Sequence, residues 1–425
     1  MAYRRRVLDD ALDELFPHLA AIAVEGAKGV GKTATASQRA ATVLDLTDPS
    51  QRRSLADNHN LVVQLRPPVL VDEWQLEPSV WDRVRKAVDD DATGGRFLLT
   101  GSASPGRGVR VHSGAGRIVS FKLRPMSLVE RGLASPTVSL RALLTGDRPP
   151  VEGATEVDLP HYVDEILRSG FPAIRELPPS ARAVQLDGYI ARIVERELPE
   201  NAVTVRRPAA LRRWLAAYAA ATSGNATYSA ILDAATPGES DKPARQTVTG
   251  YREQLTRLFV LDPVEAWIPA FAPLTRLTKT PQHHLVDPAL AARLVGVGLD
   301  GLLRGQGRRT TPRDDTKTWL GALFESLAVQ SVRVYAQAAS ATVGHLRTQN
   351  TDQEVDIIVE GVDRRVVAME VKLSAAPTGH DLRGLNWLRD RIGDQVADRV
   401  CLTTGPHAYR RDDGVAVVPL ALLGP

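Results

Sequence analysis

A glycine-rich segment near the start of the chain constrains the fold more than any other feature. Residues 26–33 read GAKGVGKT and follow the apolar run that ends at Val24, while residues from Ala34 onward can form a helix. Between a strand and a helix, such glycines let backbone N–H groups surround phosphate oxygens. The lysine neutralises the β- and γ-phosphates, and the final hydroxyl reaches Mg²⁺. The alternative is a glycine-rich turn that binds nothing. The predicted phosphate-binding residues are Gly26, Ala27, Lys28, Gly29, Val30, Gly31, Lys32 and Thr33.

Two carboxylates follow another apolar run, which occupies residues 69–71 and ends in Asp72 and Glu73. Downstream of a phosphate-binding loop, Asp72 is expected to hold Mg²⁺ through water together with Thr33, and Glu73 to orient and deprotonate the attacking water. On its own, such a run would be an ordinary strand meeting its loop. Thr100 follows the next strand, where its hydroxyl would contact the γ-phosphate or the lytic water, unless it serves only the turn.

Short apolar runs alternate with helical stretches from the start of the chain to about Arg131. Such alternation is typical of a parallel sheet with helices on both faces, so we predict an α/β domain. The expected strands are residues 21–24, 42–46, 69–71, 96–99 and 118–121.

Together these segments resemble a family of bacterial and archaeal AAA+ P-loop ATPases whose C-terminal region is a domain of unknown function. The resemblance is most specific in the ATPase core and looser beyond it. Family members typically carry Leu where Met126 stands and often Arg where Lys28 stands. The matching pieces are residues 26–33, 46–48, 70–73, 99–102, 116–117, 123–130 and 170–172.

The resemblance implies ATP as the ligand and Mg²⁺ as its cation. It also implies that Arg117 faces the γ-phosphate as an arginine finger or sensor, because transition-state charge on the phosphoryl oxygens needs a cation. The alternative is an arginine remote from the phosphate. If Arg117 acts between subunits, the chain assembles as a homo-oligomer.

The middle of the chain suggests a helical region followed by a winged helix. Residues 145–154 are expected to form a linker, and residues 228–235 and 243–258 suggest two helices before a strand at 260–267. The family resemblance agrees with this order. The second helix would contact DNA, unless the module packs against protein, through Arg245, Thr247, Thr249 and Arg252. A second basic group has two readings, a further contact with DNA or a solvated helix surface; it comprises Arg206, Arg207, Arg212 and Arg213.

Acidic and basic residues alternate on two strands expected near the C-terminus, at residues 354–359 and 366–372. Glu370 and Lys372 would share one strand face. In a symmetric hairpin Asp356 lies opposite Glu370, with Cβ atoms about 5 Å apart, and carboxylates that close repel unless a divalent cation separates them.

This pattern resembles the restriction-endonuclease-like fold, in which an Asp is followed by Glu-x-Lys on the next strand. Glu325, in an expected helix, matches an acid that this fold often carries on a helix. The resemblance implies that Asp356, Glu370 and Glu325 bind Mg²⁺ or Mn²⁺ and that Lys372 stabilises a phosphate or positions water. Phosphodiester cleavage is one outcome; a domain that keeps the carboxylates without the activity is the other.

With 425 residues, of which 43% are hydrophobic, the chain is long enough for several domains. The single Cys401 excludes an internal disulfide and fits a reducing cytoplasm, and neither a signal peptide nor a membrane span of ~20 apolar residues is expected. A net charge of +3 permits contact with DNA without arguing for it. The predicted domains are an AAA+ ATPase at 1–144, a linker and helical region at 145–224, a winged-helix-like module at 225–305 and a restriction-endonuclease-like α/β domain at 306–425.

Two hypotheses of function follow. In the first, the chain is an ATP-driven enzyme that acts on nucleic acid, with Mg²⁺ at both sites. In the second, it is a nucleotide-controlled switch or scaffold whose C-terminal domains bind a protein or DNA partner and cut nothing.

Overall fold

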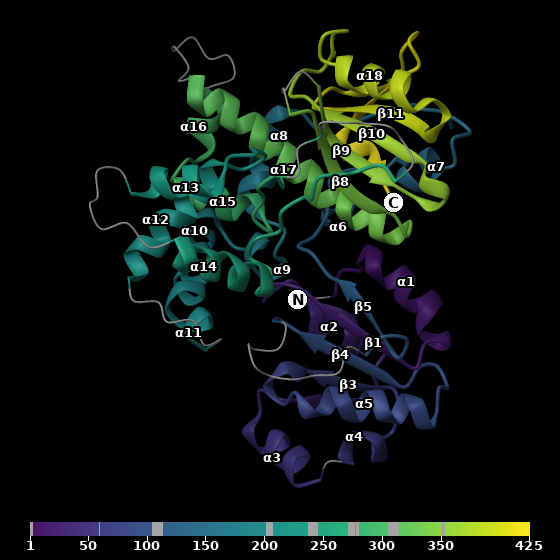
Figure 1. Ribbon diagram of the computed structural model, residues 1–425, viewed down its shortest axis with the longest axis vertical. Coiled ribbons are helices and arrows are strands. Elements are labelled where there is room, and N and C mark those ends of the chain that lie inside the picture. Colours follow the sequence, from purple (N-terminus) through teal and green to yellow (C-terminus); the bar gives the residue numbers. More distant parts are fainter. Residues whose placement is uncertain are drawn as a thin grey trace.

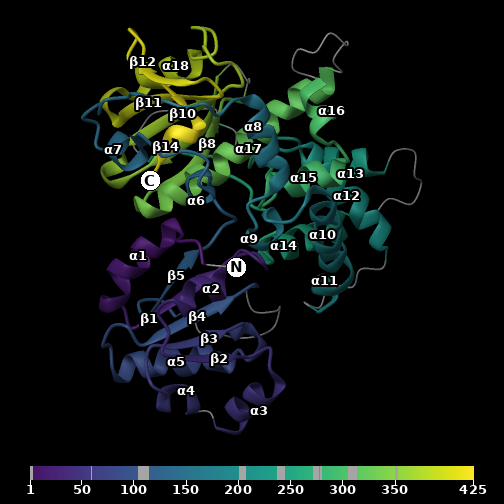
Figure 2. The same ribbon diagram turned by 180° about the vertical axis from the view of Figure 1, so that it is seen from behind.

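The computed structural model describes residues 3–58, 60–103, 114–200, 207–236, 245–270, 277, 280–304, 314–349 and 353–425. Figures 1 and 2 show an N-terminal sheet at the bottom, a C-terminal sheet at the top, and a group of helices to one side of both. Within the described residues, no helix has both the length and the apolar character needed to cross a membrane.

The N-terminal sheet confirms the predicted α/β fold. Its five strands are ordered β2-β3-β4-β1-β5, and all of their pairings are parallel. The predicted apolar runs form these strands to within one or two residues. The strands are β1 (Ala21–Glu25), β2 (Thr42–Asp45), β3 (Val69–Asp72), β4 (Phe97–Gly101) and β5 (Ile118–Lys122).

Helices cover both faces of this sheet because successive strand residues point to opposite sides. On one face, Ile22 and Val24 pack with α1 (Val7–Leu15) and α2 (Lys32–Ser37). On the other, Ala21, Ala23 and neighbouring strand residues pack with α3 (Pro49–Asp57), α4 (Leu61–Gln64) and α5 (Ser79–Asp90).

Helices fill the middle of the chain, as predicted. The elements of this region and its entry segment are α6 (Leu128–Arg131), α7 (Leu140–Leu144), α8 (Leu159–Arg168), α9 (Pro172–Arg175), α10 (Pro179–Arg192), a π-helical segment (Ile193–Glu197), α11 (Leu198–Glu200), α12 (Pro208–Ala220), α13 (Tyr228–Ala235), α14 (Arg245–Arg257), α15 (Pro288–Val295) and α16 (Leu299–Arg304).

The winged-helix prediction is only partly met. Helices α13 and α14 lie where expected, but the predicted strand at 260–267 is replaced by isolated bridges. Pro263 lacks the N–H that a continuous ladder needs, which accounts for the interruption. The first two bridges form a short antiparallel contact, and the third joins the C-terminal sheet; they are Leu261 to Leu285, Val264 to Gln282 and Ala266 to His345.

The C-terminal sheet has seven strands in the order β7-β12-β13-β11-β10-β9-β8. The long helix α17 (Asp314–Ala338) packs on one face with Ile357 and Met369, and α18 (Arg383–Ile392) packs on the other with Ile358 and Ala368. The strands with residues after 300 are β8 (Thr342–Arg347), β9 (Glu354–Glu360), β10 (Val366–Val371), β11 (Val396–Thr403), β12 (His407–Arg410) and β13 (Ala416–Pro419).

The segment predicted to be a linker is part of the C-terminal sheet. Its last two residues form β7 (Gly153–Ala154), which pairs with β12 at the sheet edge. Just before it, β6 (Val138–Ser139) pairs with β14 (Leu423–Gly424). A domain boundary at residue 144 therefore does not separate the two sheets, because residues from β6 onward already pair with strands near residue 420.

Candidate nucleotide-binding site and carboxylate site

The predicted phosphate-binding loop joins β1 to α2, as the motif requires. Gly26, Gly29 and Gly31 all have positive φ, at 154°, 83° and 101°. A Cβ atom at Gly26 would lie 2.1 Å from the backbone oxygen of Leu123, so only glycine fits there. The positive φ values and the close approach of Leu123 therefore explain these glycines without reference to a ligand.

Lys32, the first residue of α2, lies buried inside this loop with an exposed fraction of 5%. Its Nζ donates to the backbone oxygens of Gly26 and Ala27, both at 3.0 Å. Burial lowers the pKa of Lys32, while the carboxylates of Glu73 and Asp72 act in the opposite direction. The ammonium group is thus held where it would meet phosphate oxygens.

The two predicted Mg²⁺ ligands lie together. Thr33 Oγ1 donates to Asp72 Oδ1 at 2.8 Å. Thr100 donates its hydroxyl to the same oxygen, because β3 and β4 pair with Asp72 opposite Thr100. Thr100 is fully buried, so its expected contact with the γ-phosphate or lytic water is not supported; its hydroxyl orients Asp72 instead.

Glu73 follows β3 with φ at 54°, in the left-handed region that residues other than glycine seldom adopt. Such a conformation costs about 1–3 kcal/mol and tends to occur at functional sites. The Glu73 Oε2 atom accepts hydrogen bonds from Ser102 Oγ, at 2.6 Å, and from Gln75 Nε2. Gln75 was not among the predicted site residues, although its position two residues after the expected base is a signal in the sequence.

Arg117 does not lie beside the loop of its own chain. Strands β5 and β1 are parallel, with Ile118 opposite Ala21. Arg117 therefore lies at the N-terminal ends of the strands, whereas the phosphate-binding loop follows the C-terminal end of β1. Its Nε donates to Asp89 at 2.7 Å, and its side chain is 47% exposed. The structure therefore does not support a contact between Arg117 and the nucleotide of its own chain, because the length of the strands lies between them.

Parts of the middle region and of the N-terminal segment contact the phosphate-binding loop. Tyr189 Oη donates to the Lys28 oxygen at 3.2 Å, and Lys28 Nζ lies 3.5 Å from Glu197 of the π-helical segment. On another side, Arg6 donates to the Val30 oxygen at 2.8 Å. The loop is thus held by residues far from it in the sequence.

A hollow of about 700 Å³ opens beside the end of the loop. Its polar rim includes Arg4 and Glu176, which form an ion pair at 3.2 Å, and its aromatic side chain is Tyr3. The described residues that line it are Tyr3, Arg4, Arg6, Gly31, Ala34, Thr35, Ser37, Gln38, Met126, Pro172 and Glu176. It is large enough for a nucleoside.

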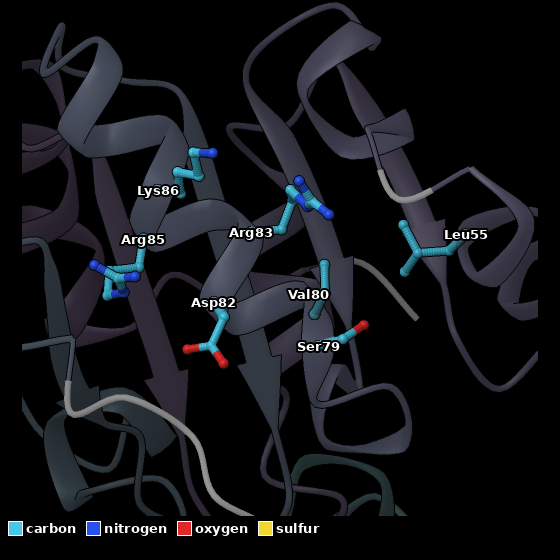
Figure 3. A pocket seen from close by; sticks show the side chains of 7 residues that line it. All are labelled: Leu55, Ser79, Val80, Asp82, Arg83, Arg85 and Lys86. Atoms are coloured by element: carbon cyan, nitrogen blue, oxygen red, sulfur yellow. The ribbon is translucent and has the colours of Figure 1, made fainter.

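A second hollow of about 410 Å³ lies between α3 and α5, and none of the nucleotide-site residues above lines it. Figure 3 shows Arg83 on the side of α5 that faces Leu55 and Arg85 pointing the other way. Arg85 pairs with Asp89 at 3.1 Å. This hollow contains neither a carboxylate pair nor a glycine-rich loop, so it suggests no chemistry.

The C-terminal carboxylates converge as predicted. Met369 of β10 pairs with Ile357 of β9, and continuing this antiparallel register by one residue places Glu370 opposite Asp356. Asp356 Oδ2 accepts a hydrogen bond from the Val371 N–H at 2.8 Å. The predicted symmetric hairpin is therefore confirmed.

The charges at this site are poorly compensated. Glu370 is buried, and its Oε2 has no hydrogen-bond partner, while Oε1 accepts from Lys372 Nζ at 2.6 Å. Burial first, and then the charge of Asp356, raise the pKa of Glu370 well above its usual range despite the nearby ammonium. Burial likewise raises the pKa of Asp356. Burial first, and then the charge of Asp356, raise the pKa of Glu325 on α17.

An orphaned carboxylate oxygen beside a second carboxylate suits a divalent cation. In the described part of the chain, however, no three His, Cys, Asp or Glu side chains form a ready-made metal cluster. A cation held by Asp356 and Glu370 would therefore need water or backbone oxygens to complete its coordination.

Two arginines, one from the predicted DNA-contacting helix and one from the second basic group, have partners within the protein. Arg252 stacks over the Tyr228 ring at 4.4 Å, and Arg212 pairs with Glu195 at 3.1 Å. Thr247 and Thr249 on α14 are exposed. Arg206 and the side chain of Arg245 lie outside the described residues.

Three family models match separate stretches of the chain. Residues 19–131 match an AAA domain, residues 159–300 match the domain of unknown function DUF8612, and residues 320–423 match the domain of unknown function DUF4143. The first match covers the parallel sheet and the phosphate-binding loop. It supports a P-loop ATPase domain, and the third agrees with the predicted C-terminal domain of unknown function.

Proteins similar in sequence occur in mycobacteria. The chain is 26% identical over 379 residues to the uncharacterized proteins Mb2031c of Mycobacterium bovis and Rv2008c of Mycobacterium tuberculosis, over 88% of this chain and 73% of each of theirs. A solved structure titled "Structure of Drosophila ORC bound to DNA" shares 14% identity, covering 60% of this chain and 86% of that chain, with a TM-score of 0.20. A likeness at that level carries no argument.

Proposed function

We propose that the N-terminal domain binds ATP with Mg²⁺ and hydrolyses it. The observation that carries the proposal is the meeting of Thr33 and Asp72 at 2.8 Å beside the buried ammonium of Lys32. Thr33 and Asp72 would hold a magnesium ion that accompanies the phosphates, and Lys32 would offset phosphate charge.

Glu73 is the proposed general base. Its carboxylate follows Asp72 directly, and the hydrogen bonds from Ser102 and Gln75 fix one of its oxygens. The other oxygen is then available to orient and deprotonate a water molecule. The nucleoside would occupy the hollow of about 700 Å³ next to Gly31, where Tyr3 offers an aromatic surface and Glu176 a hydrogen-bond acceptor.

Two lysines of the same loop provide a matched test of ATP binding. Lys32→Ala removes a buried, hydrogen-bonded charge, which typically costs about 2–5 kcal/mol or about 30-fold and more in affinity. Lys28→Ala removes an exposed side chain and should cost only a few-fold. Titration of a fluorescent ATP analogue with Mg²⁺ measures both. Equal losses in the two variants would contradict the proposed role of Lys32.

Arg117 is proposed to act on the nucleotide of a neighbouring subunit in a homo-oligomer. Arg117 lies at the N-terminal ends of the strands, on the side of the sheet away from the phosphate-binding loop, and this supports a partner outside the chain. Arg117→Ala should lower ATP hydrolysis by about 10³-fold, the low end for an arginine finger, and leave ATP affinity unchanged. If it weakens binding as much as Lys32→Ala does, the role is wrong.

A second function is favoured by the orphaned Glu370 oxygen. We propose that Asp356 and Glu370 bind Mg²⁺ or Mn²⁺, with Glu325 nearby, and that the C-terminal domain acts on nucleic acid. The cation would supply a metal-bound hydroxide and offset charge on a phosphate. Lys372, hydrogen-bonded to Glu370, would hold a phosphate oxygen or position water beside the carboxylates.

Plasmid nicking in Mn²⁺, with and without ATP, tests this second function. Wild type should nick and Asp356→Ala should not, while Asp363→Asn, in the turn of the same hairpin, should behave as wild type. If wild type binds Mn²⁺ and does not nick, the alternative holds: a nucleotide-controlled switch that binds a protein or DNA partner through a silent nuclease-like domain.

A further inference from the structure

Arg6, in the segment that precedes α1, contacts the phosphate-binding loop directly. The residue is buried, with an exposed fraction of 3%. Its Nη1 donates to the Val30 oxygen of the loop at 2.8 Å, and its Nη2 donates to the Arg124 oxygen, just after β5, at 2.7 Å. A Cβ atom built on Gly31 would lie 3.7 Å from Nη1, so the guanidinium lies against the last glycine of the loop.

Glu130 of α6 compensates the charge of this buried guanidinium. Its Oε1 lies 3.0 Å from Arg6 Nε, and its Oε2 accepts from Arg6 Nη2 at 3.3 Å. The same carboxylate accepts from the backbone N–H groups of Val7, at 2.8 Å, and Ser127, at 2.7 Å, so it is itself held in place. Because Arg6 and Glu130 together carry no net charge, Arg6 adds little to the electrostatic attraction of a phosphate. Its contribution to the loop is one of geometry.

The hydrogen bond to the Val30 oxygen fixes the direction of the next N–H group. In a planar trans peptide, the C=O of one residue and the N–H of the following residue point in opposite directions. The Val30 oxygen faces Arg6, so the Gly31 N–H points away from Arg6. Gly31 has φ at 101° and no Cβ, and a glycine lets the adjoining peptide plane rotate at little cost. A fixed partner for the Val30 oxygen therefore selects one orientation of this peptide.

We propose that Arg6 is a positioning residue that holds the Gly31 N–H toward the phosphates of the bound nucleotide. This inference rests on the ATP-binding function proposed above, in which N–H groups of the loop surround phosphate oxygens. Arginine suits this role because its planar fork reaches the Val30 oxygen, the Arg124 oxygen and the Glu130 carboxylate in one fixed geometry. Lysine has a single ammonium group on a flexible stem and does not reproduce that fork.

The test measures binding of two ligands by the full chain: Mg²⁺-ATP, and Mg²⁺-tripolyphosphate, which has the phosphates without the nucleoside. Combining Arg6→Met with Glu130→Gln removes the buried charge pair as a unit, so neither partner is left unpaired. We expect both affinities to fall by the same factor, about 10- to 100-fold, which is the contribution of a hydrogen bond to a charged group. Arg6→Lys, which keeps the charge beside Glu130, should lower both affinities as well. Arg5→Met is the control and should bind both ligands as wild type does, because Arg5 is exposed and pairs with Asp10 at 2.6 Å.

The amide signal of Gly31 separates positioning from a general loss of structure. Labelling valine with ¹³C at the carbonyl and glycine with ¹⁵N selects the four Val-Gly peptides of the sequence, of which only Val30–Gly31 lies in the phosphate-binding loop. At saturating Mg²⁺-ATP, the Gly31 amide proton should move downfield in wild type, because it donates to a charged oxygen. It should move much less in the double variant, or in Arg6→Lys if the double variant does not fold.

An equal shift of the Gly31 signal in wild type and variant would overturn the inference, as would unchanged affinities. A loss of ATP affinity without a loss of tripolyphosphate affinity would also overturn it, because Arg6 would then act on the nucleoside in the hollow that it lines. If wild type binds neither ligand, the proposed ATP binding fails and the inference fails with it.

Discussion

The two candidate sites differ in the kind of structure that brings their charged residues together. The nucleotide site is built at the ends of neighbouring parallel strands, from residues 26–33, 72–75 and 100–102. The carboxylate site joins a hairpin and a long helix: Asp356 accepts a hydrogen bond from Val371 of the same hairpin, and Glu325 on α17 accepts one from Gln282 of the middle region. The first arrangement follows from the order of parallel strands in one sheet, whereas the second depends on the packing of a sheet against a helix and the middle region.

The largest expected effect would establish that the two sites are separable. Glu73→Gln removes the proposed base while keeping size and hydrogen bonding, so ATP should bind but turnover should fall by about 10²–10⁴-fold. Asp356→Ala should leave ATP turnover near wild type. Steady-state phosphate release measures both variants. Unchanged turnover in Glu73→Gln would remove Glu73 as the base.

The next effect concerns the rigidity of the local motif. In Gly26→Ala, the new Cβ would meet the Leu123 oxygen at 2.1 Å, and the backbone φ of 154° already disfavours a side chain. We expect a loss of more than about 2 kcal/mol in stability, together with loss of ATP binding, because strand β5 would have to move. Chemical denaturation measures the first. Gly188→Ala, at a helical position with no atom within 4 Å of the new Cβ, is the control and should not destabilise the chain.

Glycines, strands and the Asp-Glu pair could be predicted because each depends on neighbours in the sequence. Alternating burial along a strand and a full phosphate-loop motif fix the sheet, and a hairpin symmetric about Asp363 fixes the opposition of Asp356 and Glu370. Contacts between residues far apart in the sequence leave no periodic pattern in it. Nothing local marks residues 153–154 as a strand of the C-terminal sheet, or Gln282 as a partner of Glu325.

Long-range strand pairing also changes two sequence-based expectations. Arg117 has the position of an arginine finger in the sequence. Only the parallel register of β5 and β1 shows that it lies at the N-terminal ends of the strands, away from the phosphate-binding loop. The domain predicted at 306–425 lacks β7, which completes its sheet, and Gln282, which contacts its Glu325. Metal binding is therefore best measured on the full chain.

A smaller effect should show whether the buried Glu370 carboxylate destabilises the folded chain. Folding raises the pKa of Glu370, so the folded chain retains a proton that the unfolded chain loses. As the pH rises above about 4.3, the pKa of this carboxyl in the unfolded chain, Glu370 therefore destabilises the fold. Without divalent cations, Glu370→Gln should raise the melting temperature at pH 8 by a few degrees, equivalent to about 1 kcal/mol, and have no effect at pH 4. A melting series in chelator from pH 4 to 8 tests this sign; a variant less stable than wild type at pH 8 would contradict it.

The smallest expected effect asks whether the nucleotide site, too, depends on the middle region. Lys28 Nζ lies 3.5 Å from Glu197, and the Lys28 side chain is 56% exposed, so this ion pair is worth at most about 1 kcal/mol. An incoming phosphate would compete with Glu197 for Lys28 and would be repelled by the same carboxylate. Glu197→Gln should therefore tighten ATP binding by up to about fivefold at low salt, and the gain should shrink as salt screens the charges. Glu195→Gln is the matched control, because Glu195 lies in the same π-helical segment but pairs with Arg212 at 3.1 Å. ATP titrations of both variants at two salt concentrations measure the difference. If the two variants behave alike, the middle region holds the loop by packing alone, and the nucleotide site is as local as its motif suggests.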